Sequence, residues 1–199
     1  TKQLKEAYPN YNFVPVYWMA TEDHDFEEIN YFNFKKNKIK WNRESSGAVG
    51  RLKTTSFDKV YKEFSELLGT SKNEQYLKEL FKKAYLNHTN LAAATKFLVN
   101  ELFGTYGLVI IDGDNSALKK QFIPIIENEL LHQTSFKEVT NTNKQLKKYS
   151  YKIQVNPREI NLFYLKDNLR ERIIFEENCY KINQTNLVFT KDEILEELY

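Results

Sequence analysis

Residues 13–25 read FVPVYWMATEDHD, so eight mostly apolar residues run directly into a polar cluster. A short apolar segment with polar residues on both sides is typical of a parallel strand that is buried on both faces. Pro15 suits an early or edge position in such a strand. A second segment, residues 107–112, reads GLVIID and has the same character. Together the two segments predict a parallel β-sheet.

Helical patterns lie between these two segments and continue after the second. Three segments between them carry apolar residues at helical spacing: residues 57–68, 77–85 and 90–103. The third is expected to bury Leu102 and Phe103 and to stop at Gly104. After the second strand, Asp114 is expected to cap one helix that runs to Leu130. Another helix is predicted over residues 134–148.

The remaining segments read as β-structure. Residues 31–42, YFNFKKNKIKWN, predict a hairpin with its tip near Lys36 and Asn37. Residues 151–189 contain five strand-like runs: YKIQV, INLFYL, RERIIFE, CYKIN and LVF. The order strand, helices, strand, helix is that of a parallel α/β sheet. We therefore expect one α/β domain over 1–199, with a parallel-sheet core, inserted helices and a strand-rich C-terminal part.

The composition excludes several classes of protein. Hydrophobic residues make up 41% of the 199, which is enough for a packed core. The 29 basic and 27 acidic residues leave a net charge of +2, which gives no sign of a general polyanion binder. The one cysteine excludes a disulfide framework and fits a reducing cytoplasm. No apolar run reaches the length of a membrane span.

Both ends of the chain lie within helical patterns. The first residues read TKQLKEAY and the last read TKDEILEELY. This predicts that the sequence is an internal part of a longer protein, cut at both ends.

Two polar clusters follow the two predicted parallel strands. One is Thr21–Asp25 and the other is Asp112–Asn115. In open parallel sheets, ligands bind outside the carboxyl ends of the strands. We therefore place the candidate site at this edge.

The first cluster holds three carboxylates and an imidazole within four residues, which are Glu22, Asp23, His24 and Asp25. Like charges this close cost free energy unless a cation, a substrate ammonium or an arginine compensates them. His24 lies between two carboxylates and can serve as a general acid or contact a phosphate. These four residues are the candidate catalytic groups. The simpler alternative is the solvated acidic start of a helix.

Six further residues are candidate substrate or nucleotide ligands. Asp112, at a strand end, could hold a metal, a ribose or an amine, and arginines bind carboxylates bidentately. For the lysine and the arginines, solvent-exposed surface positions are the simpler alternative. The six are Thr21, Asn30, Asp112, Lys119, Arg170 and Arg172. The small-residue loop 45–51 lacks the spacing of a P-loop, so we interpret it as an ordinary connection; the alternative is that its backbone N–H groups and Arg51 contact an anion.

Two other functions use different residues. A metal-dependent nucleotidyl or phosphoryl transferase would use the carboxylates of Glu22, Asp23, Asp25 and Asp112. A non-catalytic protein or nucleic-acid interaction module would use the basic hairpin Lys35–Trp41. The balanced overall charge favours a solvated hairpin tip instead.

The run VPVYWMATEDHDFEEIN, residues 14–30, is similar to the signature of the cysteine-adding enzymes of bacillithiol biosynthesis. Residues 102–112 with the Leu-Lys pair at 118–119, and residues 161–164 with Arg170 and Arg172, agree with it in order and spacing. The first match is specific and the other two support it. Together these matches span most of the chain.

This resemblance implies a Rossmann-like core and a cytoplasmic ligase that adds L-cysteine to glucosaminyl-malate. It implies small-molecule substrates rather than nucleic acid or membrane, ATP or a related nucleotide as energy source, no assigned metal, and a homodimer as an option for the full-length protein. The family's upstream Thr-Gly-Gln-Gln motif, its downstream glycine-rich segment and its coiled coil have no counterpart in this sequence. We therefore expect this chain to lack part of the catalytic site.

Overall fold

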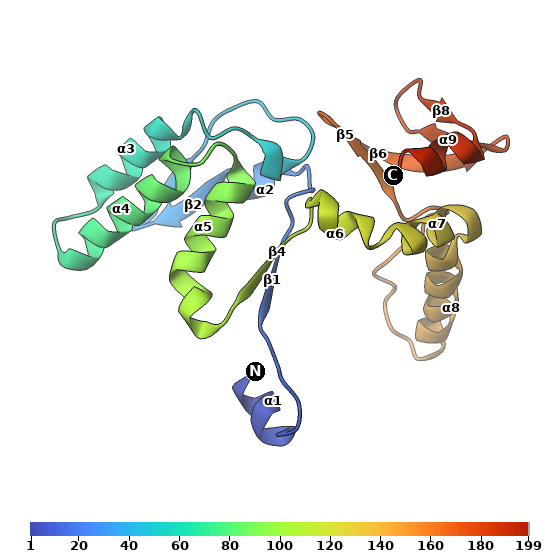
Figure 1. Ribbon diagram of the computed structural model, residues 1–199, viewed down its shortest axis with the longest axis horizontal. Helices are drawn as coiled ribbons and strands as arrows, with labels where there is room; N and C mark the ends of the chain where they lie inside the picture. Colours follow the sequence, from blue (N-terminus) through green and yellow to red (C-terminus); the bar gives the residue numbers. More distant parts are fainter. Residues whose placement is uncertain (199) are drawn as a thin grey trace. The chain divides into compact units, whose positions relative to one another are not determined.

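The computed structural model describes residues 1–198, and contacts within the chain gather into two compact units (Figure 1). The first unit is Thr1–Asp114 and the second begins at Asn115. Each unit is described by itself below. The prediction of one domain over the whole chain stays a prediction. No helix within the described residues is long and apolar enough to cross a membrane.

The first unit contains both parallel strands. Its elements in order are α1 (Lys2–Ala7), β1 (Val16–Met19), α2 (Phe26–Ile29), β2 (Tyr31–Phe34), β3 (Asn37–Lys40), the 3-10 helix η1 (Val49–Arg51), α3 (Phe57–Leu67), α4 (Lys72–Leu86), α5 (Leu91–Phe103), the 3-10 helix η2 (Gly104–Tyr106) and β4 (Val109–Asp112).

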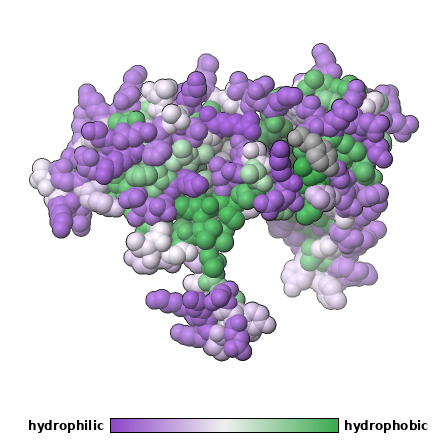
Figure 2. Space-filling view, in the orientation of Figure 1, coloured by the Kyte–Doolittle hydropathy of each residue, from purple (hydrophilic) through white to green (hydrophobic). Residues whose placement is uncertain are grey.

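The strands β1 and β4 pair in parallel, as the sequence predicted. Val16 lies opposite Val109 and Met19 lies opposite Asp112. The expected burial on both faces is wrong, because Val16 and Trp18 are more than half exposed. Figure 2 shows apolar residues gathered where Figure 1 places this pair of strands. A two-stranded sheet against which α5 packs cannot cover all of its apolar side chains.

The same exposure corrects two predictions for side chains beside the strands. Leu102 and Phe103, at the end of α5, were expected to be buried but are exposed. Trp18, within the strand expected to be buried on both faces, is exposed, whereas Phe26 at the start of α2 is buried. A helical period identifies a face of the helix, but it does not say how far along the helix that face is covered.

The core of the first unit lies between the β2–β3 hairpin and the helices α3 and α4. The ring of Phe64 contacts the rings of Phe32, Phe34 and Phe81. Trp41 packs on Phe57 with ring centroids 4.2 Å apart. Offset and edge-to-face aromatic contacts of this kind add to the free energy of burial. The hairpin and the helices are therefore parts of one hydrophobic core.

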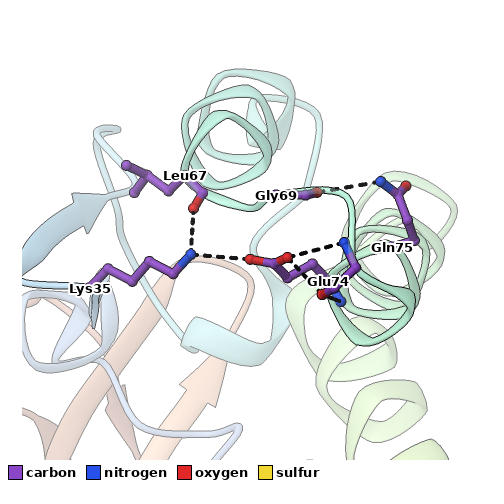
Figure 3. A network of polar contacts seen from close by, with 6 residues as sticks. Lys35, Leu67, Gly69, Glu74 and Gln75 are labelled. Atoms are coloured by element: carbon purple, nitrogen blue, oxygen red, sulfur yellow. Dashed lines mark hydrogen bonds and ion pairs between the residues drawn. The ribbon is translucent and has the colours of Figure 1, made fainter.

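A polar network holds the hairpin tip to the junction of α3 and α4 (Figure 3). The Lys35 ammonium donates to the Leu67 carbonyl at 3.1 Å and to the Glu74 carboxylate at 3.2 Å. The hydroxyl and N–H of Ser71 also donate to this carboxylate. These donors, led by the Ser71 hydroxyl, lower the pKa of Glu74 to about 2. The tip itself places Lys35 and Lys36 at positive φ, as a tight hairpin turn requires.

The second unit has four helices and a four-stranded antiparallel sheet. Its elements in order are α6 (Ser116–Lys120), α7 (Ile123–His132), α8 (Thr134–Lys148), β5 (Phe163–Lys166), β6 (Leu169–Glu176), β7 (Cys179–Ile182), β8 (Val188–Phe189) and α9 (Lys191–Glu196). The helix predicted over residues 134–148 is confirmed.

Two predictions for this unit are wrong. One helix was expected up to Leu130, but the chain forms α6 and then α7. Pro124 explains the break, because it lacks an N–H and is favoured only in the first turn of a helix, where it lies in α7. Residues 151–155 were expected to be a strand and are irregular. An alternating pattern forms a strand only where a neighbouring edge is available for hydrogen bonding.

The antiparallel sheet has one covered face. Tyr164, Ile173, Tyr180 and Ile182 point to this face and pack with Leu130 of α7 in a second core. The hydroxyl of Tyr180 also donates to the Leu130 carbonyl at 3.1 Å. Cys179 points to the other face and is partly exposed.

Candidate functional site at the carboxyl edge of the parallel strands

The parallel pairing brings the two polar clusters together. Since Met19 lies opposite Asp112, the loops that follow β1 and β4 leave the sheet at the same edge. The N–H of Gly113 donates to the Met19 carbonyl at 3.3 Å and extends the pairing into the second loop. A side chain at Gly113 would lie 3.1 Å from the indole nitrogen of Trp18, so the glycine permits this close approach.

Thr21 and Asp112 form the centre of this edge. Thr21 is 6% exposed, and its hydroxyl donates a short hydrogen bond to Oδ1 of Asp112. The backbone N–H of Asp114 is shared between the Thr21 hydroxyl at 3.1 Å and Asp112 Oδ1 at 3.0 Å. Within residues 1–198, no donor is bonded to Oδ2 of Asp112, so this oxygen stays available to a ligand.

Arg51 joins this edge from a distant part of the sequence. Its Nε and Nη2 contact the two carboxylate oxygens of Asp114 at 2.5 and 2.8 Å. The pair is bidentate, which is the strong geometry for an arginine and a carboxylate. Asp114 was expected to cap the following helix; that prediction is wrong, because Asn115 is the cap and accepts from the Leu118 N–H. The carboxylate of Asp114 is engaged by the guanidinium instead.

The loop 45–51 contributes more than an ordinary connection. Its η1 turn donates the N–H of Val49 to the Asp23 carbonyl at 2.7 Å and the N–H of Gly50 to the Thr21 carbonyl at 2.8 Å. A Cβ at Gly50 would lie 2.5 Å from Cβ of Thr21, so only glycine allows the contact. These bonds hold the backbone of the acidic turn. Sequence reasoning missed the role; a glycine followed by an arginine among small residues was the available signal.

The side chains of the acidic turn point outward from this fixed backbone. His24 is 59% exposed and Asp23 is 49% exposed. Oδ1 of Asp23 accepts from the His24 N–H at 2.7 Å and lies 3.2 Å from Nδ1 of the imidazole. A carboxylate beside Nδ1 orients the ring and leaves Nε2 on its far side. Asp25 occupies the N-cap position of α2 without a side-chain capping bond.

The other predicted ligands are Asn30 in the first unit and three residues of the second unit. Asn30 is buried after α2, and neither polar atom of its amide makes a hydrogen bond. The amide still helps Lys40 to lower the pKa of Glu27, although it falls short of hydrogen-bond geometry. Lys119 on α6 and the two arginines of β6, Arg170 and Arg172, belong to the second unit.

The geometry of the described residues gives little support to the two alternative functions. Within the described chain, no three or more histidine, cysteine or acidic side chains are grouped closely enough to hold a metal ion. In the basic hairpin, Trp41 is buried and Lys38 lies 3.7 Å over the ring of Tyr31. The tryptophan is therefore not exposed for stacking on a base.

The first unit is thus an α/β unit with a polar site at the carboxyl edge of its two parallel strands. The family model for the N-terminal Rossmann-like domain of bacillithiol biosynthesis BshC matches residues 1–199. The chain belongs to this family.

Individual relatives agree with the family model. The chain is 61% identical over 198 residues to a protein of Flavobacterium johnsoniae named "Putative cysteine ligase BshC", covering 100% of the chain and 37% of the relative. Proteins with the same name from Cytophaga hutchinsonii and Staphylococcus saprophyticus are 43% and 28% identical over 98% and 100% of the chain, and the chain covers 35% and 39% of them. The chain therefore spans little more than a third of the length of these relatives, which are enzymes by name.

Proposed function

We propose that this chain supplies part of the active site of a cytoplasmic ligase that adds L-cysteine to glucosaminyl-malate. Family membership supports a ligase of bacillithiol biosynthesis. One observation carries the assignment of the site: the acidic turn and Asp112 lie at the same sheet edge, and η1 holds the turn. Ligand sites in open parallel sheets lie at this edge.

The proposed chemistry is amide formation: the amine of the sugar attacks the carboxyl carbon of cysteine after a nucleotide has activated that carboxyl group as an acyl phosphate or adenylate. Phosphate or AMP then leaves as the C–N bond forms. The amine must lose a proton to attack. His24 is the proposed base, since its ring is exposed and Asp23 contacts its Nδ1. Oδ2 of Asp112 is the proposed acceptor for a substrate ammonium group. Glu22 and Asp25 add negative charge to the turn, which favours the binding of an ammonium group.

No residue of this chain is assigned to the binding of the energy source. The family resemblance suggests ATP, but the N–H groups of Val49 and Gly50 already donate to carbonyls of the acidic turn. These two N–H groups are therefore not available to a phosphate. Thr21, Asn30, Lys119, Arg170 and Arg172 stay predicted ligands for the remaining parts of the substrates.

The test is cysteine-dependent product formation by the full-length protein that contains this chain. We expect His24→Ala to lower kcat by about 10²–10⁴-fold, the usual contribution of a general base. Asp23→Asn should lower it less, because the ring stays in place. The matched control is His132→Ala on α7, an exposed histidine that is not among the proposed site residues, which should keep the wild-type rate. Wild-type rates for His24→Ala and Asp25→Asn would remove the turn from the mechanism.

A further inference from the structure

The antiparallel sheet of the second unit has an open face that carries two arginines. Neighbours along a strand alternate between faces, so Arg170 and Arg172 point to the same side of β6. The pairing of β5 and β6 places Phe163 directly opposite Arg172, and Leu165 directly opposite Arg170. The core residues Tyr164 and Ile173 occupy the other face. The two guanidinium groups therefore lie away from the core of their own unit.

Arg172 lacks the acceptor that a half-buried guanidinium needs. Its Nε is shielded from solvent, and no hydrogen-bond acceptor reaches it within residues 1–198. The carboxylate of Glu171 is on the opposite face. Glu176 shares the open face, but it contacts the Lys181 ammonium at 3.4 Å. A buried polar group without a partner is rare in folded proteins and costs free energy, which a bound acceptor would recover.

The surroundings of Arg172 suit a small oxyanion. The guanidinium of Arg170 lies 4.0 Å from the centroid of the Phe163 ring, and Phe163 is the residue paired opposite Arg172. Ile174, next on the same face of β6, is partly buried and adds an apolar border. An arginine fork binds a carboxylate or a phosphate through two parallel hydrogen bonds, and apolar surroundings strengthen the attraction.

We propose that this open face is an oxyanion site in which Arg172 binds a carboxylate or phosphate group of a small molecule, with Arg170 stacked on Phe163 as its second cation. This inference rests on the proposed ligase function and deepens it, because Arg170 and Arg172 are already predicted substrate ligands there. Binding is measured without turnover, so a failed ligase assay and a failed anion titration are separate results.

The test titrates isotope-labelled chain with succinate and, separately, with inorganic phosphate at constant ionic strength. Amide signals of β5 and β6 should shift with saturation at millimolar concentrations, as expected for a single small-ligand contact. Saturation by succinate alone identifies a carboxylate ligand, and saturation by phosphate alone identifies a phosphate group. Neither anion shifting these signals overturns the proposal.

Two variants locate the binding group. Arg172→Gln should weaken binding at least about tenfold, because the amide keeps neither the charge nor the fork. Lys181→Gln is the matched control on the same face, since its ammonium is already paired with Glu176 and Glu177, and its affinity should stay within about twofold. Wild-type affinity in Arg172→Gln contradicts the proposal. The wild-type titration maps the site without any variant, so it holds even if that variant folds poorly.

Discussion

The two sheets of this chain obtain their stability in different ways. The antiparallel sheet β5–β8 connects strands that follow one another, and it carries a core on one face. The parallel pair β1 and β4 joins strands about 90 residues apart and leaves Val16 and Trp18 exposed. Its loops are fixed at the carboxyl edge. There, η1 donates hydrogen bonds to the loop after β1, and Arg51 pairs with Asp114 in the loop after β4. The antiparallel sheet thus has a structural core, whereas the parallel pair has a polar edge that suits a binding site.

Truncating the antiparallel core gives the largest expected effect. Ile182 is 1% exposed, and Ile182→Ala should lower the free energy of unfolding by about 2–5 kcal/mol, through lost burial and the cavity left behind. Val16→Ala on the exposed β1 should cost less than about 1 kcal/mol. Urea denaturation of both variants checks this. Equal costs would show that the two sheets do not differ in this way.

The edge of the parallel pair should be sensitive at Gly50. In Gly50→Ala, the new methyl group would collide with Thr21, and we expect a loss of about 1–3 kcal/mol in the free energy of unfolding. Gly104→Ala is the matched control, because there the methyl group meets only the flexible side chain of Asn100. Thermal unfolding of both variants measures the difference. A neutral Gly50→Ala would mean that η1 does not hold the turn.

The ion pair between Arg51 and Asp114 should contribute less. A double-mutant cycle with Arg51→Gln and Asp114→Asn should give a coupling free energy of about 1 kcal/mol, because the pair is bidentate but the guanidinium is 43% exposed. Added salt should reduce this coupling. A cycle with no coupling would show that this ion pair does not stabilise the folded chain.

The Glu74 carboxylate should make the stability of the chain depend on pH. The pKa of Glu74 is about 2 in the folded chain and near 4.5 when unfolded, so the unfolded state binds the proton more readily. Its contribution to stability is present above about pH 4.5 and declines as the pH falls towards 2. Urea midpoints measured across this range should depend on pH less in Glu74→Gln than in the wild type. Identical pH profiles would contradict the low pKa of Glu74, which the Ser71 hydroxyl lowers most and the Lys35 ammonium less.

Local pattern was sufficient for most elements of the fold. The apolar runs in residues 13–20 and 107–112 predicted the parallel strands, and the helical pattern over residues 90–103 predicted α5, whose start the Asn90 side chain caps. The failures came where local pattern could not report on coverage or on partners. The irregular residues 151–155 and the exposed Trp18 are examples, since both depend on what lies beside them in space.

The candidate site was also predicted only in part from the sequence. The sequence alone placed the Thr21–Asp25 cluster and Asp112 at strand ends. Charged residues that follow an apolar strand of a parallel sheet lie at the edge where ligands bind. Only the tertiary structure brought Gly50 and Arg51 to that edge, because a contact between residues 63 positions apart leaves no periodic trace in the sequence. Likewise, only strand register put Phe163 and Arg172 side by side on one face. Register depends on hydrogen bonding between strands rather than on any single segment.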